Sequence, residues 1–163
     1  MKRNLTPICT RVRWMIRKDM PRVLDIEFAT FDFPWCKPDF IRCLRQQNCI
    51  GIVCEHDGLV VGYMIYELHR KKIRVLNFAV APGCRRQGVG RAMVAKLKSK
   101  LSEQRRFRIC LAVRERNLDA QLFFRSQGFQ AVTVIHRFYE VEEDYRNEDA
   151  ILFQFRHRPE DKS

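Results

Sequence analysis

The sequence lacks the features that define several large classes of protein. It has no run of 18 apolar residues, so we expect no membrane-spanning helix. Its first residues, Met1 to Pro7, include basic side chains but no apolar stretch, so we expect no secretory signal. The seven cysteines are odd in number and form no Cys-x-x-Cys pair. Because most of them stand in apolar runs, we expect free thiols in a reducing cytoplasm.

Signals for metal and for the commonest nucleotide loops are also absent. The spacing of Cys43, Cys49 and Cys54 fits no usual zinc pattern, so no metal is expected. The chain has no Gly-x-x-x-x-Gly-Lys-Ser/Thr loop. The segment Gly88-Val89-Gly90 lacks the third glycine of the dinucleotide-binding fingerprint. Any phosphate site must therefore be of another kind.

One segment nevertheless has the chemistry of a phosphate site. An apolar stretch ending at Val80 reads as a buried strand, and Val89 begins an apolar pattern at helical spacing. Between them lies a turn with glycines and two arginines, Arg85 and Arg86. The first amides of a helix are unpaired and its dipole favours negative charge there. The segment is either a phosphate-binding loop or a plain strand-to-helix connection, and its composition favours the first.

Net charge is +12, so acidic partners are attracted to the chain. RNA or a ribonucleoprotein surface is the leading candidate, although no recognised RNA-binding motif appears. The same excess is also explained by solubility and a basic cofactor site. The segment from Glu140 to Asp149 is acidic, and reads either as a solvated hairpin tip or as an attractor for a cationic amine.

Periodicity predicts a single domain over residues 1–163, with its core at about 9–157. Asp19 and Asn117 can cap helices, Gly128 can end one, and Asp57-Gly58 fits a hairpin turn. The fold class is α/β (α+β). Strands are expected at 11–17, 50–55, 60–68, 73–80, 107–113, 129–139 and 150–156, and helices at 19–28, 39–47, 88–103 and 118–127.

Several segments in this order resemble the GNAT N-acetyltransferases, and most nearly the bacterial ribosomal-protein alanine N-acetyltransferase group. They are Ile26-Glu27 with Phe33-Pro34-Trp35, Asn77-Phe78-Ala79-Val80 through Arg85-x-x-Gly88-x-Gly90-Arg91, Val113-Arg114 with Asn117 and Ser126-x-Gly128-Phe129, and Tyr139 with Glu148-Asp149-Ala150. The resemblance covers nearly the whole chain. It implies a mixed sheet of about seven strands, splayed between 73–80 and 107–113 and flanked by about four helices.

The resemblance also implies acetyl-CoA as acyl donor. The pantetheine arm would pair with the backbone of 78–80, and the pyrophosphate would lie on the amides of 86–91. The Asn117 side chain would meet the pantetheine end, or be only a helix cap. The cofactor-binding residues implied are Phe78, Ala79, Val80, Arg85, Arg86, Gln87, Gly88, Val89, Gly90, Arg91, Asn117 and Phe124.

At two positions the chain departs from the family's pattern. Where the resembling enzymes carry a glutamate base and a tyrosine acid, this chain has Ala112 and Phe124. Glu27 and Tyr139 are then the catalytic candidates, or they only position the substrate. The resemblance implies an acceptor site formed by Glu27, Phe33, Trp35 and Tyr139. His136 is a further candidate because histidine as a residue type changes charge near neutral pH, but it shares a strand face with apolar side chains, so we expect it to be packed or exposed at an edge.

A missing base matters less for an α-amine than for a lysine. With a pKa near 8, an α-amine is about 10% neutral at pH 7, against roughly 0.04% for lysine. The sequence therefore predicts an acyltransferase acting on a protein or peptide N-terminus, which includes ribosomal proteins, as a monomer or weak dimer. A small-molecule amine as acceptor, and an acyl-CoA-binding module with little or no turnover, stay as alternatives.

Overall fold

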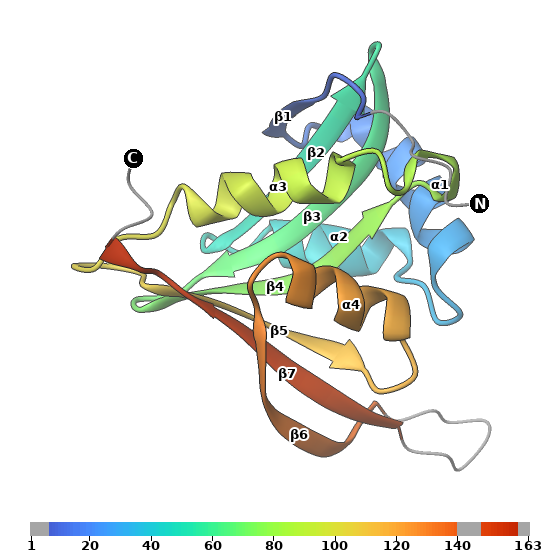
Figure 1. Ribbon diagram of the computed structural model, residues 1–163. Coiled ribbons are helices and arrows are strands. Elements are labelled where there is room, and N and C mark those ends of the chain that lie inside the picture. The colour runs from blue at the N-terminus through green and yellow to red at the C-terminus, as the bar shows by residue number, and fades with distance from the viewer. Residues whose placement is uncertain (1–6, 140–147, 160–163) are drawn as a thin grey trace. The chain divides into compact units, whose positions relative to one another are not determined.

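The computed structural model describes residues 7–139 and 148–159, and its elements are labelled in Figure 1. The strands are β1 (Arg11–Trp14), β2 (Cys49–His56), β3 (Leu59–Leu68), β4 (Lys72–Val80), β5 (Arg108–Arg114), β6 (Gln130–Tyr139) and β7 (Glu148–Arg156). The α-helices are α1 (Met20–Thr30), α2 (Lys37–Leu44), α3 (Val89–Lys98) and α4 (Leu118–Ser126), with short 3-10 helices η1 (Arg17–Asp19) and η2 (Pro82–Cys84). No helix in these described ranges is long and apolar enough to cross a membrane.

The strands form one mixed sheet in the order β1-β2-β3-β4-β5-β7-β6. Strands β4 and β5 are parallel, and their pairing joins Lys72, Ile73 and Arg74 to the first three residues of β5. This confirms the mixed α/β fold expected from the sequence. The chain divides into two compact units. The first comprises Met1–Leu68 and Leu76–Ser99, and the second His69–Val75 and Lys100–Ser163, so that β4 begins in the second unit and ends in the first.

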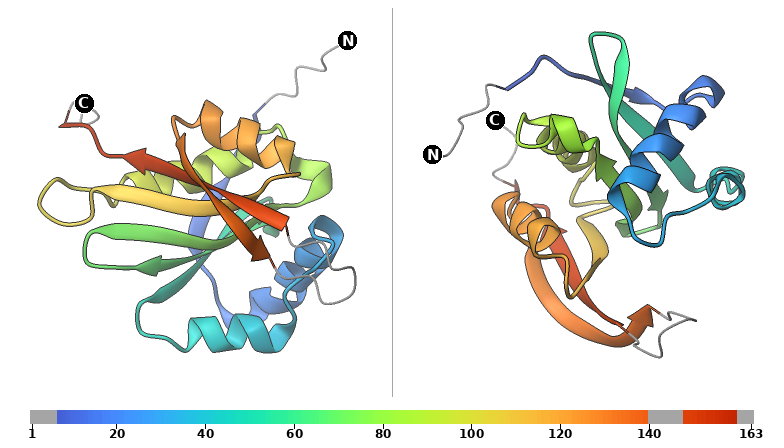
Figure 2. Two further views of the ribbon diagram at one scale, coloured as in Figure 1. Left: turned by 90° about the horizontal axis from the view of Figure 1, so that it is seen from below. Right: turned by 90° about the vertical axis from the view of Figure 1, so that its right-hand side faces the viewer.

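In the first unit, β1, β2 and β3 pair antiparallel. The β2–β3 turn has Asp57 at φ 49° and Gly58 at φ 77°, the left-handed conformations that the Asp-Gly pair predicts. Helices α1 and α2 lie on one face of these strands and α3 on the other (Figures 1 and 2). Two glycines allow this close approach. A Cβ on Gly62 would come within 2.7 Å of Met93 in α3, and one on Gly51 within 3.1 Å of Leu44 in α2.

The second unit has its own core. Strand β7 pairs antiparallel with both β5 and β6. Phe124 from α4 and Phe129 lie with ring centroids 5.3 Å apart, and Phe129 lies 5.5 Å from Phe155 of β7. Gly128, at φ 85°, turns the chain between α4 and β6, as expected of a glycine that ends a helix.

Some elements end elsewhere than periodicity predicts. Helix α3 ends at Lys98, not 103. The Ser99 hydroxyl donates to the Lys96 carbonyl at 2.6 Å, and this local bond competes with continued helix. Helix α2 runs over 37–44 instead of 39–47, because Asp39 is the third helical residue and accepts from the Cys36 amide at 2.8 Å. The acidic segment predicted over 140–149 lies, apart from its last two residues, outside the described residues.

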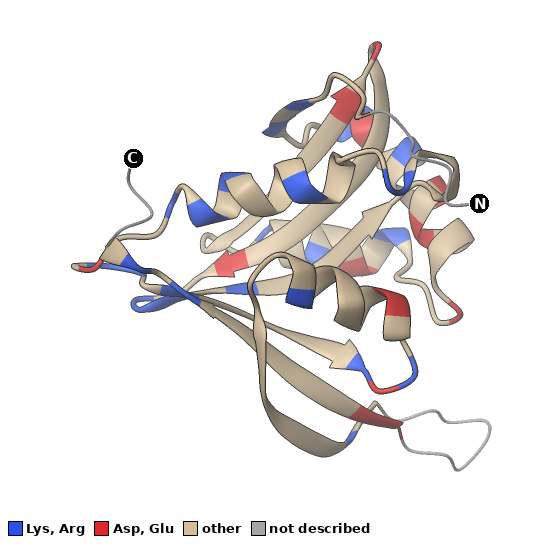
Figure 3. Ribbon diagram, viewed as in Figure 1, with Lys and Arg blue, Asp and Glu red and all other residues tan. Residues whose placement is uncertain are grey.

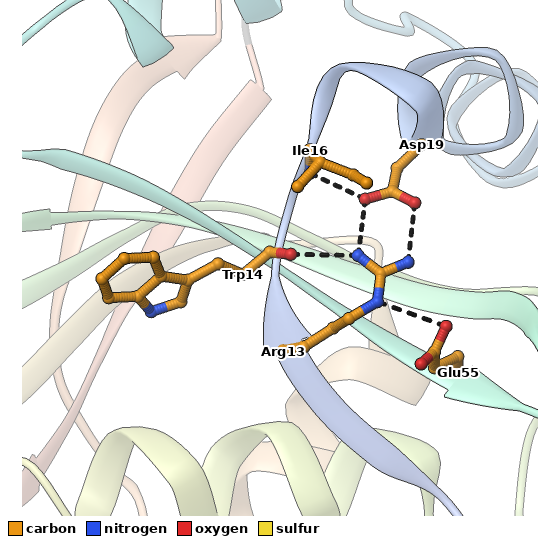
Figure 4. Close-up of polar contacts among 5 residues, drawn as sticks. All are labelled: Arg13, Trp14, Ile16, Asp19 and Glu55. Carbon is orange, nitrogen blue, oxygen red and sulfur yellow. Dashed lines mark hydrogen bonds and ion pairs between the residues drawn. The ribbon is translucent and has the colours of Figure 1, made fainter.

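Asp19 precedes α1 but does not cap it. Its carboxylate instead accepts two hydrogen bonds from the Arg13 guanidinium, both at 2.8 Å, and one from the Ile16 amide (Figure 4). The Arg13 Nε also pairs with Glu55 of β2 at 3.2 Å. The start of α1 is therefore fixed to β1 and β2 by an ion-pair network, a role that the sequence pattern does not reveal.

Candidate functional site

The strand-to-helix segment of the first unit has the backbone of an anion-binding loop. After the short helix η2, Arg86 adopts φ 61° and Gly88 φ 87°. A non-glycine residue rarely takes such an angle, and alternation with ordinary residues turns successive amides toward one side. The Ile8 amide donates to the Gln87 carbonyl at 3.2 Å, so this carbonyl has a donor within the protein. This backbone conformation is one in which successive amides can face a common anion, and phosphate binding stays a prediction.

Helix α3 starts without a side-chain cap. Gly88 is its N-cap residue, and the first intrahelical bond runs from the Ala92 amide to the Gly88 carbonyl at 3.0 Å. The amides of Val89, Gly90 and Arg91 precede that bond, so they have no acceptor inside the helix. A Cβ on Gly88 would have one neighbour, Pro7 at 4.0 Å. Open space at uncapped amides fits a phosphate group.

The three arginines of this segment are not equivalent. The Arg85 guanidinium donates to the Val80 carbonyl at 3.3 Å and to the Thr30 hydroxyl at 3.4 Å, so it links β4 to α1. Arg85, Arg86 and Arg91 are all exposed, so the two hydrogen bonds of Arg85 are what sets it apart. The sequence alone treated all three alike.

Residues 78–80 form the end of β4, directly before this loop. Ala79 is buried, and Phe78 and Val80 are half-buried. The Ala81 amide donates to the Val61 carbonyl of β3 at 2.8 Å, which fixes the exit of the chain from the strand. The end of β4, the loop and the start of α3 thus form one continuous segment, which this hydrogen bond attaches to β3.

Glu27 lies in the interior of the first unit, 1% exposed. One carboxylate oxygen accepts from the Trp35 amide at 2.8 Å. The other accepts from the Tyr63 hydroxyl and, at 3.0 Å, from the Asn77 amide group. Burial raises the pKa of Glu27, and the bonds from Trp35 and Asn77 oppose this rise. The carboxylate therefore connects α1, the segment before α2, β3 and β4.

Sequence reasoning missed the two side chains that complete this network. Tyr63 is fully buried and Asn77 is 8% exposed, both within apolar strands. The signal for Asn77 was available, since an amide at an inward position of a buried strand needs a buried partner. Of the expected acceptor residues, Trp35 packs edge-on against Phe40 at 5.3 Å, whereas Phe33 is 58% exposed.

Tyr139 lies in the second unit, half-buried at the end of β6. Its hydroxyl donates to the Ala112 carbonyl at 3.5 Å. The Arg114 guanidinium lies 3.9 Å from the centroid of the Tyr139 ring and pairs with Glu148 at 2.8 Å. Burial raises the pKa of Tyr139. Because the phenol stays protonated at neutral pH, it can donate a hydrogen bond or a proton but is a poor base.

The remaining predicted residues of the second unit make contacts within that unit. The Asn117 side chain accepts from the Ala120 amide at 3.1 Å, so the expected helix cap is present. Phe124 is 3% exposed in the aromatic core. His136 is exposed, as expected, and lies 2.9 Å from Asp149, whose other oxygen accepts from the Arg137 amide at the same distance.

Known proteins resemble this chain in sequence. A model of the acetyltransferase (GNAT) family matches residues 16–129. The [ribosomal protein bS18]-alanine N-acetyltransferase of Escherichia coli is 27% identical over 134 residues, which cover 82% of this chain and 88% of the relative.

Solved structures show the same fold. The ribosomal-protein-S18-alanine N-acetyltransferase from Escherichia coli superposes with a TM-score of 0.79 at 24% identity, covering 91% of this chain and 94% of that one. Ard1 from Thermoplasma volcanium gives 0.81 at 24% identity, covering 93% and 99%. With a family model spanning well over half its length, the chain belongs to the acetyltransferase (GNAT) family.

Proposed function

We propose that this protein transfers the acetyl group of acetyl-CoA to the N-terminal α-amine of a protein, such as a ribosomal protein. The observation that carries the proposal is the loop ahead of α3. In a chain of the acetyltransferase family, left-handed Arg86 and Gly88 lead into a helix start whose first three amides have no acceptor inside the helix. Acetyl-CoA is the donor that acetyltransferases of this family use.

The residues of the loop fit the pyrophosphate of that donor. The amides of Val89, Gly90 and Arg91 would bind its oxygens, and the Arg86 and Arg91 side chains would supply positive charge. Acetyl-CoA brings an activated acetyl thioester to the reaction. What the protein must add is orientation of the amine and a path for one proton.

The positions that the resemblance assigns to a glutamate base and a tyrosine acid hold Ala112 and Phe124 in this chain. We assign Glu27 a positioning role, because its carboxylate is fully engaged by three donors. Tyr139 is the remaining proton donor among the predicted residues. An acceptor that is already about 10% neutral at pH 7 suits such a site, and this favours an α-amine over a lysine.

We place the reaction in the cytoplasm, carried out by a monomer or weak dimer. All seven cysteines are free, which fits a reducing compartment. A small-molecule amine stays a possible acceptor, since this fold serves many. Because the side chains at 112 and 124 are apolar, an acyl-CoA-binding module without turnover stays a second alternative function.

The test is release of CoA from acetyl-CoA with peptides that copy ribosomal protein N-termini, each matched by the same peptide with a blocked α-amine. We expect mass increase by one acetyl group on the free peptides only. Turnover of small amines alone would favour a small-molecule acetyltransferase. Cofactor binding without turnover on a broad panel of acceptors would favour an acyl-CoA-binding module.

The donor site is tested separately by Gly88→Asp, with Gly83→Asp as the matched control. Both place a carboxylate in one exposed loop, and nothing lies within 4 Å of a Cβ on Gly83. Aspartate tolerates the left-handed region and can cap a helix, so Gly88→Asp should fold. We expect calorimetry to show acetyl-CoA affinity lost in Gly88→Asp and retained in Gly83→Asp. Equal affinities would remove the loop from the site.

A further inference from the structure

A second, strongly basic surface lies entirely within the second unit. Three segments form it: the turn His69–Lys72, the loop Lys100–Arg108 and the end of β7 at Arg156–Arg158. We call it the basic edge. Figure 3 shows the blue segments gathered at the β3–β4 turn, the loop before β5 and the end of β7. Glu103 is its one carboxylate among the described residues, against the cations Arg70, Lys71, Lys72, Lys100, Arg105, Arg106, Arg108, Arg156 and Arg158.

This surface is hollowed. One concavity of about 460 Å³ is lined by Glu103, Phe107 and five neighbours, namely Arg70, Lys71, Gln104, Arg105 and Arg106. Another of about 360 Å³ is lined by Glu103, Phe107, Arg156 and His157. The two share Phe107 and Glu103, so an aromatic ring stands where they adjoin. Phe107 thus has basic residues in the hollow on either side of it.

Backbone bonds hold the three segments together at Phe107. Its amide donates to the Lys71 carbonyl at 3.1 Å, and its carbonyl accepts from the His157 amide at 2.7 Å. The Arg106 Nε donates to the His69 carbonyl at 2.6 Å. The hollows are therefore formed by fixed backbone in the free protein, which limits the conformational cost of binding a partner.

Contacts with the Phe107 ring and with the His69 carbonyl engage some of the cations, but carboxylates within the described part of the chain do not balance their charge. Arg108 and Arg156 are direct partners across β5 and β7, where like charges destabilise a strand pair. Their guanidiniums lie 5.8 Å and 5.4 Å from the centroid of the Phe107 ring. The Arg108 Nε is buried and has no hydrogen-bond acceptor. Among the described residues, no ion pair joins a cation of the basic edge to a carboxylate.

We propose that the basic edge binds single-stranded RNA. Phosphates would lie on the arginines of the hollows, since planar guanidiniums bind phosphate through two parallel bonds. An unpaired base would stack on the Phe107 ring, as bases stack on aromatic side chains in sites that bind single strands. This binding does not depend on acetyl transfer, and it would bring the protein to ribonucleoprotein substrates.

The shape of the surface favours RNA over other acidic partners. Docking on a membrane surface uses apolar side chains that insert among the lipids. Here the one aromatic side chain, Phe107, is half-buried between two hollows. An acidic peptide would pair with the arginines but has no flat group for the ring. A chain that alternates phosphates with planar bases matches both features.

The test measures fluorescence anisotropy of labelled single-stranded RNA of about 12 nucleotides, within the range that such sites cover. The variant is Arg105→Glu/Arg156→Glu, and its control is Lys18→Glu/Arg45→Glu, which changes net charge equally at exposed positions of the first unit. We expect about tenfold weaker binding in the variant than in the control, and a shallower dependence of affinity on salt. Equal loss in both proteins overturns the proposal.

A second variant, Phe107→Leu, keeps an apolar side chain but removes the flat ring. We expect it to weaken RNA binding roughly 5- to 150-fold, the range for one lost stacking contact. The Arg156→Glu change of the first variant should not destabilise the fold. Its new carboxylate would face Arg108 across the strands, so we expect Tm to stay the same or rise. For Arg105→Glu/Arg156→Glu we therefore expect weaker RNA binding together with an unchanged or higher Tm.

Other polyanions complete the test. Vesicles of phosphatidylserine with phosphatidylcholine, and poly-glutamate, are titrated at the same concentration of charge. We expect both to bind more weakly than RNA and to be insensitive to Phe107→Leu. Binding to either that is tighter than to RNA and is lost in Arg105→Glu/Arg156→Glu would overturn RNA as the partner.

Discussion

A carboxylate that accepts three hydrogen bonds inside a protein core has little freedom to collect a proton from a substrate. Glu27 is such a group, with Trp35, Tyr63 and Asn77 as donors. Two of these partners border the expected site: Trp35 lies in the segment implied for the acceptor, and Asn77 precedes the strand residues implied for the donor. On the proposed function, Glu27 would therefore act at a distance, by fixing segments that would contact the reactants.

Replacing Glu27 distinguishes positioning from proton transfer. Glu27→Gln keeps an acceptor for the Trp35 amide, and its amide can bond to Asn77 if the latter rotates. We expect kcat of Glu27→Gln to stay within a few-fold of the wild type. Glu27→Ala leaves three buried donors unsatisfied, and we expect it to lose about 3–5 kcal/mol of stability. A loss of kcat by about 10² or more in well-folded Glu27→Gln would instead identify a base.

The pH dependence of stability gives the same comparison an independent readout. Burial raises the pKa of Glu27, so its charged form opposes folding at neutral pH. The stability linked to this group is complete below the unfolded-state pKa of about 4.3 and is lost as pH rises through the folded-state pKa. In urea unfolding, the free energy of unfolding of Glu27→Gln, taken relative to that of the wild type, should therefore be higher at pH 7 than at pH 4.5. The opposite trend would contradict a raised pKa.

Single residues were predictable where chemistry is local. Asn117 was identified as a cap because asparagine before an apolar helical pattern has that local function, and the Ala120 amide confirms it. Glu27 was found through resemblance, but its burial was not. Its partners Tyr63 and Asn77 lie 36 and 50 positions away in sequence, and only tertiary packing brings them to it.

At the scale of elements, the ion-pair network of Arg13 holds β1 to the start of α1 and to β2 (Figure 4). Asp19 is 6% exposed, so its charge depends on this one guanidinium. The Arg13 guanidinium holds the pKa of Asp19 below its usual range. A buried carboxylate that loses its cation is strongly destabilising.

We expect Arg13→Met to lower the free energy of unfolding by about 2–4 kcal/mol at pH 7. Methionine retains the apolar stem, so the loss reports the charge. Since the pKa of Asp19 is lowered, its stabilisation is complete above the unfolded-state value of about 3.9 and lost as pH falls through the folded-state value. Urea unfolding of both proteins should show a constant difference between pH 5 and 7 that shrinks at pH 3. A difference unchanged at pH 3 would point to lost packing instead.

Elements were predicted in number and order, and less well at their ends. Apolar periodicity located every strand and all four α-helices among the described residues, because it reflects the faces that pack. The ends depend on single bonds that compete with the pattern. The Ser99 hydroxyl bonds to the backbone where α3 ends, and the Asp19 carboxylate binds the Arg13 guanidinium instead of capping α1. Such competition is decided by partners that periodicity does not contain.

At the scale of the whole molecule, the positive charge is distributed between at least two surfaces with different expected partners. Arg86 and Arg91 belong to the donor loop of the first unit, and the basic edge belongs to the second. Composition predicted an acidic partner but could not divide the charge between the two surfaces. A single domain over 1–163 stays a prediction, since the chain separates into two compact units.

A net charge of +12 predicts opposite effects of salt on folding and on cofactor binding. Like charges repel one another in the compact state, and added NaCl screens that repulsion. Screening worth about 1 kcal/mol would raise Tm by about 2–4 °C for a chain of this size. Acetyl-CoA carries phosphates to exposed arginines, so its affinity should fall, by roughly fivefold or more, between 0.05 and 0.5 M NaCl.

The two effects are separated by Lys18→Glu/Arg45→Glu. This variant lowers the net charge at exposed positions outside the donor loop and α3. With less repulsion to screen, its Tm should rise less with NaCl than that of the wild type. Its acetyl-CoA affinity should fall with salt as steeply as before, because Arg86 and Arg91 are intact. If calorimetry shows affinity that is indifferent to salt in both proteins, the arginines of the loop are solvated and contribute no charge to the bound cofactor.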